Sequence, residues 1–336
     1  MTSEYPFPDL LGAATGIGSM PGTDAREAAK TSTGALEQLP FLPELPARGP
    51  GADMIGRSAG LLVELFAEVQ PSGWRFADRP GRDTRRAHSW LGEDLDALEE
   101  FTQGYQGALK LQAVGPWTLA ASIELKYGEK ALADPGACRD IAGSLAEGLR
   151  RHLADVRKRV PGAQPVLQLD EPTLPAVLAG RVKTASGFQR LRSVDRQLAE
   201  EVLRELIRSV DAPVIVHSCA PGVPIPLLRR AGVAGVSLDF GLLTEREDDV
   251  IGEAVEAGTV ILAGVVPSTD EDMSDPAGSV TGVRTLWRRL GLDPELLGRR
   301  VLVTPTCGLA GASPAYARKA LSLSVRGAQS LVDNPE

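Results

Sequence analysis

The chain contains little cysteine, histidine or aromatic residue. Its 336 residues include three cysteines and three histidines, and aromatic residues make up 4% of the total. Three cysteines are too few for a disulfide framework in a chain of this length, and in a reducing compartment they would remain thiols. We therefore examine each cysteine and histidine as a metal ligand or a nucleophile.

Long apolar runs and a surplus of basic residues are also missing. No stretch approaches the roughly 18 apolar residues that span a bilayer. The first ten residues, MTSEYPFPDL, lack the basic flank and the apolar core of a signal peptide. The net charge of −8 argues against a nucleic-acid surface, which needs a concentrated basic patch. We expect a cytoplasmic protein that binds neither membranes nor nucleic acids.

Short apolar runs rich in β-branched residues recur along the chain, and most are followed by an amphipathic stretch with helical spacing. Near-continuous apolar strands that alternate with helices predict a parallel sheet covered by helices. Eight such units favour an α/β fold of the single (β/α)₈ TIM-barrel type, with an open doubly wound sheet as the alternative. The predicted strands are 14–19, 45–49, 109–115, 166–170, 213–218, 235–240, 260–267 and 301–306, and the clearest helices are 144–160, 194–210, 225–231 and 248–257.

The second predicted unit is irregular. Its strand, 45–49, is short and bounded by proline and glycine, and the stretch 70–94 holds two tryptophans and many charges without clean periodicity. We predict an elaborated loop region after strand 2, followed by a helix at 95–105. The whole chain, 1–336, is expected to form one domain, because TIM barrels commonly run to about 250 residues or more as one domain.

Metal-ligating side chains gather at the ends of the predicted strands, where a barrel of this kind carries its active site. His217 and Cys219 end the fifth strand, Asp239 the sixth and Cys307 the eighth. A His-x-Cys pair on an extended segment points both side chains to one face. An imidazole, two thiolates and a carboxylate form a set that suits zinc. Singly, each cysteine could instead be a small buried hydrophobe and the histidine a core residue.

Cys138 and His152 lie away from this rim. Cys138 falls at a loop or helix start and His152 on the polar side of a predicted helix, so we expect structural or surface roles for both.

Two carboxylates, Asp170 and Glu171, follow the fourth strand. Adjacent side chains on a strand point to opposite sides, so only one can easily face the mouth of the barrel. That carboxylate would bind a substrate ammonium or act as a base; the alternative is a helix cap with a barrel-closing ion pair. The segment 16–19, GIGS, lacks the spacing of a dinucleotide-binding or phosphate-binding loop. We predict that it presents backbone amides to a carboxylate.

Together, these residues resemble the C-terminal catalytic barrel of the cobalamin-independent methionine synthases. The matching pieces are GIGSMPGT, LQAVGPWTL, VLQLDEPTLPA, VIVHSCAP, VSLD and VTPTCGLAG, in the family's order over about residues 15–323. The N-terminal barrel of the full-length enzymes has no counterpart, so the chain resembles a single-barrel form. The resemblance implies zinc-dependent transfer of a methyl group to the thiol of homocysteine, which forms methionine.

The resemblance also implies the roles of the rim residues. The zinc ligands of the family fall on His217, Cys219, Asp239 and Cys307, with Asp239 in place of the family's glutamate. Zinc would lower the pKa of the substrate thiol so that a thiolate exists at neutral pH.

The homocysteine contacts of the family fall on Ile17, Ser19 and Asp170. We take Asp170 as the candidate catalytic residue, and we add Glu171 to the candidate substrate-binding residues.

Three departures from the family concern substrate and donor binding. The loop after strand 2 reads ARGPGADM, in which Asp53 is the only carboxylate nearby and no glutamate stands. The position of the folate-stacking tryptophan reads Ser122, with Trp117 close, and Pro267 takes the place of the catalytic histidine. The donor is methyltetrahydrofolate or a methyl-corrinoid, and the departures favour the corrinoid, whose leaving group needs no proton.

Two other functions compete with a methyltransferase. One is a non-catalytic zinc-binding barrel that senses a thiol. The other is a zinc hydrolase with an open position for water, which two thiolate ligands disfavour because they donate charge to the metal.

Overall fold

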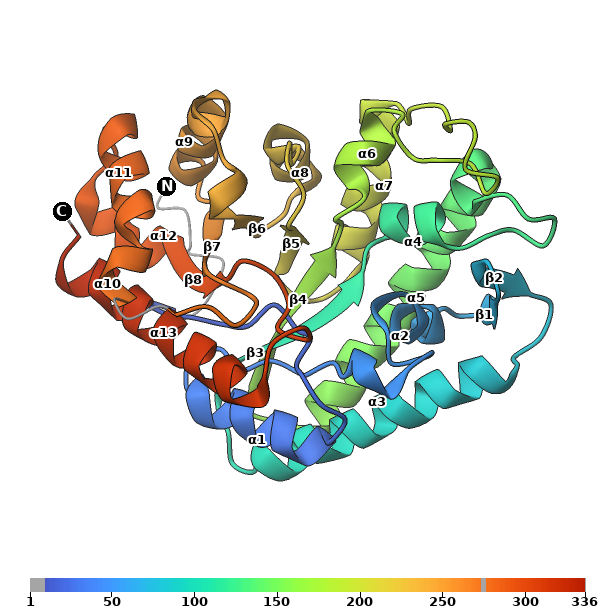
Figure 1. The fold of residues 1–336 in the computed structure, drawn as a ribbon, viewed down its shortest axis with the longest axis horizontal. Helices are drawn as coiled ribbons and strands as arrows, with labels where there is room; N and C mark the ends of the chain where they lie inside the picture. Colours follow the sequence, from blue (N-terminus) through green and yellow to red (C-terminus); the bar gives the residue numbers. More distant parts are fainter. Residues whose placement is uncertain (1–9, 273–275, 336) are drawn as a thin grey trace.

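The computed structural model describes residues 10–272 and 276–335, so nine of the ten N-terminal residues considered above lie outside it. Its centre is a six-stranded parallel sheet in the order β3-β4-β5-β6-β7-β8, which curls into a half-barrel (Figure 1). Each strand lies within three residues of its predicted bounds, because these apolar runs are buried on both faces. The strands are β3 Gly107–Val114, β4 Ala163–Asp170, β5 Val214–Ser218, β6 Gly235–Asp239, β7 Val260–Val266 and β8 Val301–Pro305.

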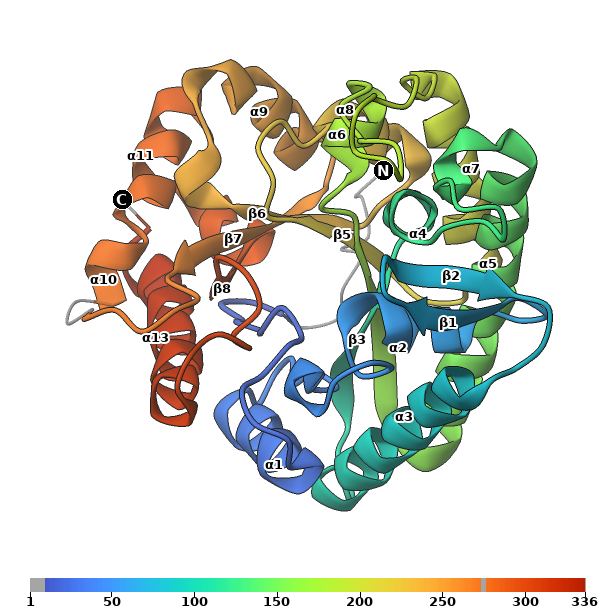
Figure 2. The same cartoon turned by 45° about the vertical axis from the view of Figure 1, so that its right-hand side comes forward.

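Two extended segments lie between β8 and β3 (Figure 2). The first forms a parallel bridge from Ala14 to Val303 of β8, and the second forms one from Phe41 to Lys110 of β3. A third parallel bridge, between Ser19 and Glu44, joins the two segments to each other. Pairing thus continues across the opening of the half-barrel, but through isolated bridges.

The prediction of regular strands at 14–19 and 45–49 is therefore wrong. The first segment lies tightly against its neighbour, since a Cβ on Gly16 would be 2.3 Å from the ring of Phe41. The second is a single 3₁₀ turn, Pro46–Arg48, because proline has no N–H to donate to a ladder. Extended backbone lies just upstream instead, at 40–44. Six of the eight predicted strands are regular strands in the part of the chain that the structure describes.

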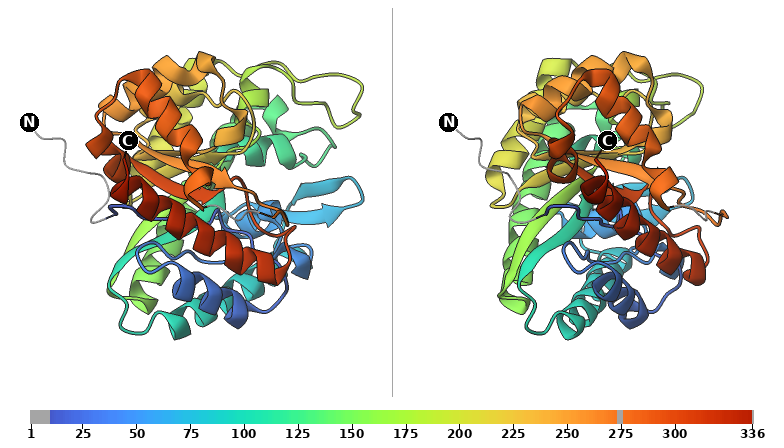
Figure 3. Two further views of the ribbon diagram at one scale, coloured as in Figure 1. Left: turned by 60° about the vertical axis from the view of Figure 1, so that its left-hand side comes forward. Right: turned by 90° about the vertical axis from the view of Figure 1, so that its left-hand side faces the viewer.

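The predicted loop at 70–94 is also more ordered than expected. After helix α2 (Met54–Leu61), strands β1 (Phe66–Gln70) and β2 (Gly73–Ala77) form an antiparallel hairpin, which projects from the body in Figure 3. Helix α3 (Arg82–Phe101) follows and includes most of the helix predicted at 95–105. Only part of one face of α3 is buried, and its first turns carry many charges. Apolar residues therefore do not recur along it with a clear helical period.

The remaining helices surround the sheet (Figure 1). The four clearest predicted helices are confirmed as parts of α5, α7, α8 and α9, and none extends more than two residues beyond the observed helix. No helix in the described ranges combines the length and apolar character needed to cross a bilayer. The bounds are α1 Ala25–Ala35, α4 Pro116–Ser122, α5 Pro135–Arg159, α6 Leu174–Leu178, α7 Arg196–Ser209, α8 Ile225–Ala231, α9 Asp248–Glu256, α10 Pro276–Ser279, α11 Thr281–Leu290, α12 Leu297–Arg300 and α13 Pro314–Asp333.

Helix α5 corrects the placement of one histidine. His152 is 5% exposed rather than on a polar face. Burial lowers the pKa of its imidazole to about 4. Cys138, in the first turn of the same helix, is also buried, and burial raises the pKa of its thiol to about 11. Both side chains pack in the protein interior, as expected for structural residues.

Candidate active site

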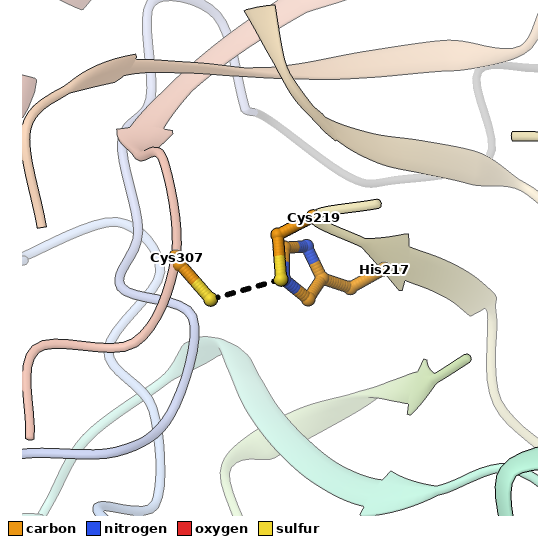
Figure 4. A group of neighbouring side chains, drawn as sticks. All are labelled: His217, Cys219 and Cys307. Carbon is orange, nitrogen blue, oxygen red and sulfur yellow. Dashed lines mark hydrogen bonds between the residues drawn. The ribbon is translucent and has the colours of Figure 1, made fainter. Parts of the chain in front are cut away.

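His217, Cys219 and Cys307 meet at the carboxyl edge of the sheet (Figure 4). His217 lies in β5, Cys219 follows that strand, and Cys307 follows β8. Their ligand atoms all lie within 4.8 Å of one another, and the two sulfur atoms are 3.1 Å apart. Both cysteines are free thiols. Among the residues that the structure describes, this is the one group of three or more His, Cys, Asp and Glu side chains that could hold a metal ion.

The hydrogen bonding of His217 fits a ligand role. Its Nδ1 lies 2.9 Å from Oγ of Ser237, which orients the ring. Its Nε2 is buried and has no hydrogen-bond partner in the protein. A buried polar atom without a partner costs free energy, and metal-binding histidines usually have their other nitrogen held in this way. The residues present therefore fit a metal ion bound by Nε2 and the two sulfur atoms.

The two thiols influence each other's ionisation. The Cys219 thiol and the His217 imidazole lower the pKa of Cys307 against the effect of burial. The neighbouring Cys307 and burial raise the pKa of Cys219. Thiolates are the form in which cysteine binds metals, and the arrangement favours ionisation of one thiol of the pair.

Asp239, the fourth expected ligand, is not brought into this group. It ends β6, and its Oδ1 accepts a hydrogen bond of 2.9 Å from the backbone N–H of Gly241. Aspartate commonly bonds the backbone two residues ahead of itself. Its side chain here caps the 3₁₀ turn Phe240–Leu242 instead of reaching the two sulfurs.

A cavity of about 150 Å³ connects the metal-ligating group to two buried carboxylates. Asp170 and Glu44 line it, as do Ile17 and Ser19, which the sequence had indicated as substrate contacts. Its lining is completed by Gly18, Pro46, Met54, Pro172, Gly308 and the three potential metal ligands.

Asp170 and Glu171 point to opposite sides, as strand geometry predicts. Glu171 does not line the cavity: its carboxylate accepts hydrogen bonds from the N–H groups of Trp117 (2.9 Å) and Thr118 (2.8 Å). The Thr118 hydroxyl donates a third, of 2.6 Å. The N-cap residue of α4, Gly115, has no side chain to cap the helix, so Glu171 supplies the cap. The assignment of Glu171 to substrate binding is corrected in favour of the helix-cap alternative.

Glu44 is a candidate residue that the sequence did not reveal. It is 6% exposed, and its Oε1 lies 3.5 Å from Nε of Arg57. Burial raises the pKa of Glu44 to about 7, opposed by Arg57 and reinforced by Asp170. Asp53, the only nearby carboxylate recognised from sequence, instead caps α2 by accepting from Gly56 N–H. Because the sequence predicted the second strand at 45–49, Glu44, the last residue of the extended segment 40–44, was not recognised as a candidate.

Ser122 and Pro267 occupy the two positions at which the resemblance leads us to expect donor-binding residues. Trp117 is 1% exposed and donates its indole N–H to the carbonyl of Ala199, so its ring belongs to the core. Pro267 follows β7, and its carbonyl accepts from the Tyr316 hydroxyl.

All three histidines of the chain lie in the described ranges. His88 bonds the carbonyl of Gly60, and His152 is buried in α5. His217 is therefore the one imidazole at the carboxyl edge of the sheet.

The curled parallel sheet and the His-Cys-Cys group at its edge define an α/β protein of the TIM-like class with a candidate metal centre. Residues 12–330 match the family model described as the catalytic domain of cobalamin-independent synthase. The chain belongs to this family, and it is accordingly a methyltransferase of the methionine-synthase type.

A solved structure supports the fold. A B12-independent methionine synthase from Shewanella sp. W3-18-1, in complex with selenomethionine, superposes with a TM-score of 0.63 at 12% identity, covering 95% of this chain and 97% of that one. A GH113 β-mannanase from Alicyclobacillus acidocaldarius gives a lower TM-score of 0.44 at 13% identity, over 98% and 100% of the two chains. No curated protein sequence matches the chain.

Proposed function

We propose that the protein is a zinc-dependent methyltransferase that converts homocysteine to methionine. The observation that carries this proposal is the cavity that joins the His-Cys-Cys group to Asp170 and Glu44. Such a cavity suits a small molecule with a thiol at one end and an ammonium at the other. Homocysteine is a molecule of this kind, and membership of the cobalamin-independent synthase family supports it as the substrate.

At the thiol end, His217, Cys219 and Cys307 would hold the zinc ion. Zinc is usually four-coordinate, and a catalytic site leaves one position for substrate. When bound, zinc lowers the pKa of a thiol so that a thiolate exists at neutral pH. Asp239 could join only by giving up its bond to Gly241, so we propose three protein ligands and a substrate sulfur.

At the amino-acid end, Asp170 and Glu44 would take the ammonium. Burial raises the pKa of both carboxyls, and the charge of Asp170 raises the pKa of Glu44 further. A cation between the two would relieve this repulsion. The amides of residues 17–19 would bind the substrate carboxylate. Within the described ranges, none of these three N–H groups donates a hydrogen bond to the protein.

The methyl donor that suits this site best is a methyl-corrinoid. Methyl transfer from the folate needs a proton on the departing nitrogen, and His217, the one imidazole at the carboxyl edge, is assigned to the metal. Trp117, which is buried, offers no stacking surface. A corrinoid leaving group keeps the electron pair of the broken bond and needs no proton. Methyltetrahydrofolate is the alternative donor.

The isolated bridges of segments 14–19 and 40–44 support a finer description of the fold. We propose that they take the places of the first two strands of a single-domain (β/α)₈ barrel. We also propose that the protein works in the cytoplasm, where its three cysteines would stay reduced.

Zinc content and methionine formation test the function. Elemental analysis should find close to one zinc per chain in the wild type and in the matched control Cys138→Ser, whereas Cys219→Ser and Cys307→Ser should lose it. The wild type should form methionine from homocysteine and methylcobalamin. Equal zinc in all four proteins would mean that the metal site is elsewhere. Binding of zinc and homocysteine without turnover from either donor would favour the thiol-sensing alternative.

A further inference from the structure

Lys110 is a buried cation that the proposed reaction does not use. It lies in the middle of β3 and is 0% exposed. Its Nζ lies 2.8 Å from the Ile17 carbonyl, 2.8 Å from Oε1 of Gln168 and 3.3 Å from Oε1 of Gln112. It is also 5.5 Å from the centre of the Phe41 ring. A lysine is almost never fully buried unless its ammonium is paired, so this position requires an explanation.

The hydrogen-bond acceptors around Lys110 favour its ammonium form. The orientation of both amide side chains is settled by other contacts: Gln112 donates its Nε2–H to the Leu42 carbonyl, and Gln168 donates to Ile17. Their Oε1 atoms and the Ile17 carbonyl are therefore three acceptors facing one nitrogen. A neutral amine has two N–H groups, whereas the ammonium has three. Burial lowers the pKa of Lys110 to about 7, and Asp170 and Glu44 oppose that effect.

This network reaches both parts of the proposed amino-acid subsite. The Ile17 carbonyl accepts from Lys110 and also from Nε2 of Gln168, at 2.9 Å. It belongs to the segment 17–19, whose amides we assign to the substrate carboxylate. The same Nε2 donates to Oδ1 of Asp170 at 2.7 Å, the carboxylate that we assign to the substrate ammonium. One oxygen of Asp170 is thus held by the protein, and the charge of Lys110 opposes the raised pKa values of Asp170 and Glu44.

We propose that Lys110 is a positioning residue for the amino-acid end of the substrate, acting directly on the Ile17 carbonyl and through Gln168 on Asp170. By this route it sets the preference of the site for α-amino thiols and thioethers over molecules that lack the amino group. The inference rests on the proposed function, because it takes Asp170 and residues 17–19 as the subsite.

Lys110→Met tests this role, because methionine has a similar length and no charge. The readout is calorimetric binding, to the full-length zinc-loaded protein, of methionine and of 4-(methylthio)butanoate, which lacks the amino group. The wild type should prefer methionine. In Lys110→Met the affinity for methionine should fall about tenfold or more, and the ratio between the two ligands should fall with it, at unchanged zinc content. The exposed Lys126, paired with Asp78, provides the control Lys126→Met, which should match the wild type.

A second variant keeps the test decisive if Lys110→Met does not fold. Gln168→Met preserves the lysine but removes its link to Asp170, and should show the same loss of preference. Wild-type methionine affinity in the variants would overturn the positioning role alone, as would equal weakening of both ligands, the sign of general structural damage. Failure of the wild type to bind methionine would instead overturn the proposed function, and the positioning role with it.

Discussion

Asp170 and Glu171 are neighbours and are both buried, yet truncation of each to alanine should affect a different property of the protein. Glu171→Ala removes the acceptor of three hydrogen bonds, two of them from backbone N–H groups in the first turn of α4. Asp170→Ala removes one acceptor of Gln168, whose Nε2 still donates to Ile17. The first change should damage the fold and the second the binding of substrate.

The size of each effect follows from these contacts. Without Glu171, two buried N–H groups lose their acceptor, at about 1–3 kcal/mol each. Burial raises the pKa of Glu171 to about 7, so removing this carboxylate offsets part of that loss. We expect the free energy of unfolding of Glu171→Ala to be about 3 kcal/mol lower. Asp170→Ala relieves repulsion with Glu44 and Glu171 but loses attraction to His217 and Lys110. Because these effects offset each other, its stability should stay within about 1 kcal/mol of the wild type.

Urea unfolding followed by circular dichroism measures the stabilities, and calorimetry with methionine measures binding to the folded protein. Glu171→Ala should be less stable with near-wild-type affinity, and Asp170→Ala should bind at least about tenfold more weakly. A Glu171→Ala protein with wild-type stability and no methionine binding would refute the reasoning, because Glu171 would then face the substrate.

Three further predictions concern residues outside the cavity. Burial lowers the pKa of His152 from 6.5 to about 4, so the folded protein excludes a proton that the unfolded chain binds below pH 6.5, and stability is lost as the pH falls through this window. Between pH 7 and 5 the wild type should lose about 2 kcal/mol of its free energy of unfolding through this histidine. Urea denaturation at both pH values should show that His152→Leu lacks this loss. Trp117→Leu should lower the free energy of unfolding by about 2 kcal/mol without changing the KM for the methyl donor in steady-state kinetics; a raised KM would place the ring at the donor. Asp94→Asn disrupts two buried ion pairs and should cost about 3 kcal/mol in urea unfolding, whereas Arg26→Met, which breaks an exposed pair with Glu100, should cost less than about 1 kcal/mol.

Much of the fold could be predicted because the relevant signals are local. Six strands follow their apolar runs, and His217 and Cys219 share a face because side chains alternate along a strand. The meeting of this pair with Cys307 follows from the rule that strand ends share one edge of a parallel sheet. The two irregular segments near the N-terminus were less readable, because prolines and glycines interrupt their pattern and isolated bridges leave no period in the sequence.

The sequence by itself therefore determined the parallel α/β architecture, the residues at the edge of the sheet and the alternation that sends Asp170 and Glu171 to opposite sides. Only the tertiary structure decided which of these two faces the cavity, because the partner that holds Glu171 is Thr118, 53 residues earlier in the chain. It likewise placed Glu44 in the site, turned Asp239 towards Gly241 and buried Lys110 between Ile17 and Gln168. Side-chain alternation and burial are encoded along a segment, whereas the hydrogen-bond partner of a buried polar group depends on which distant segments the fold brings together.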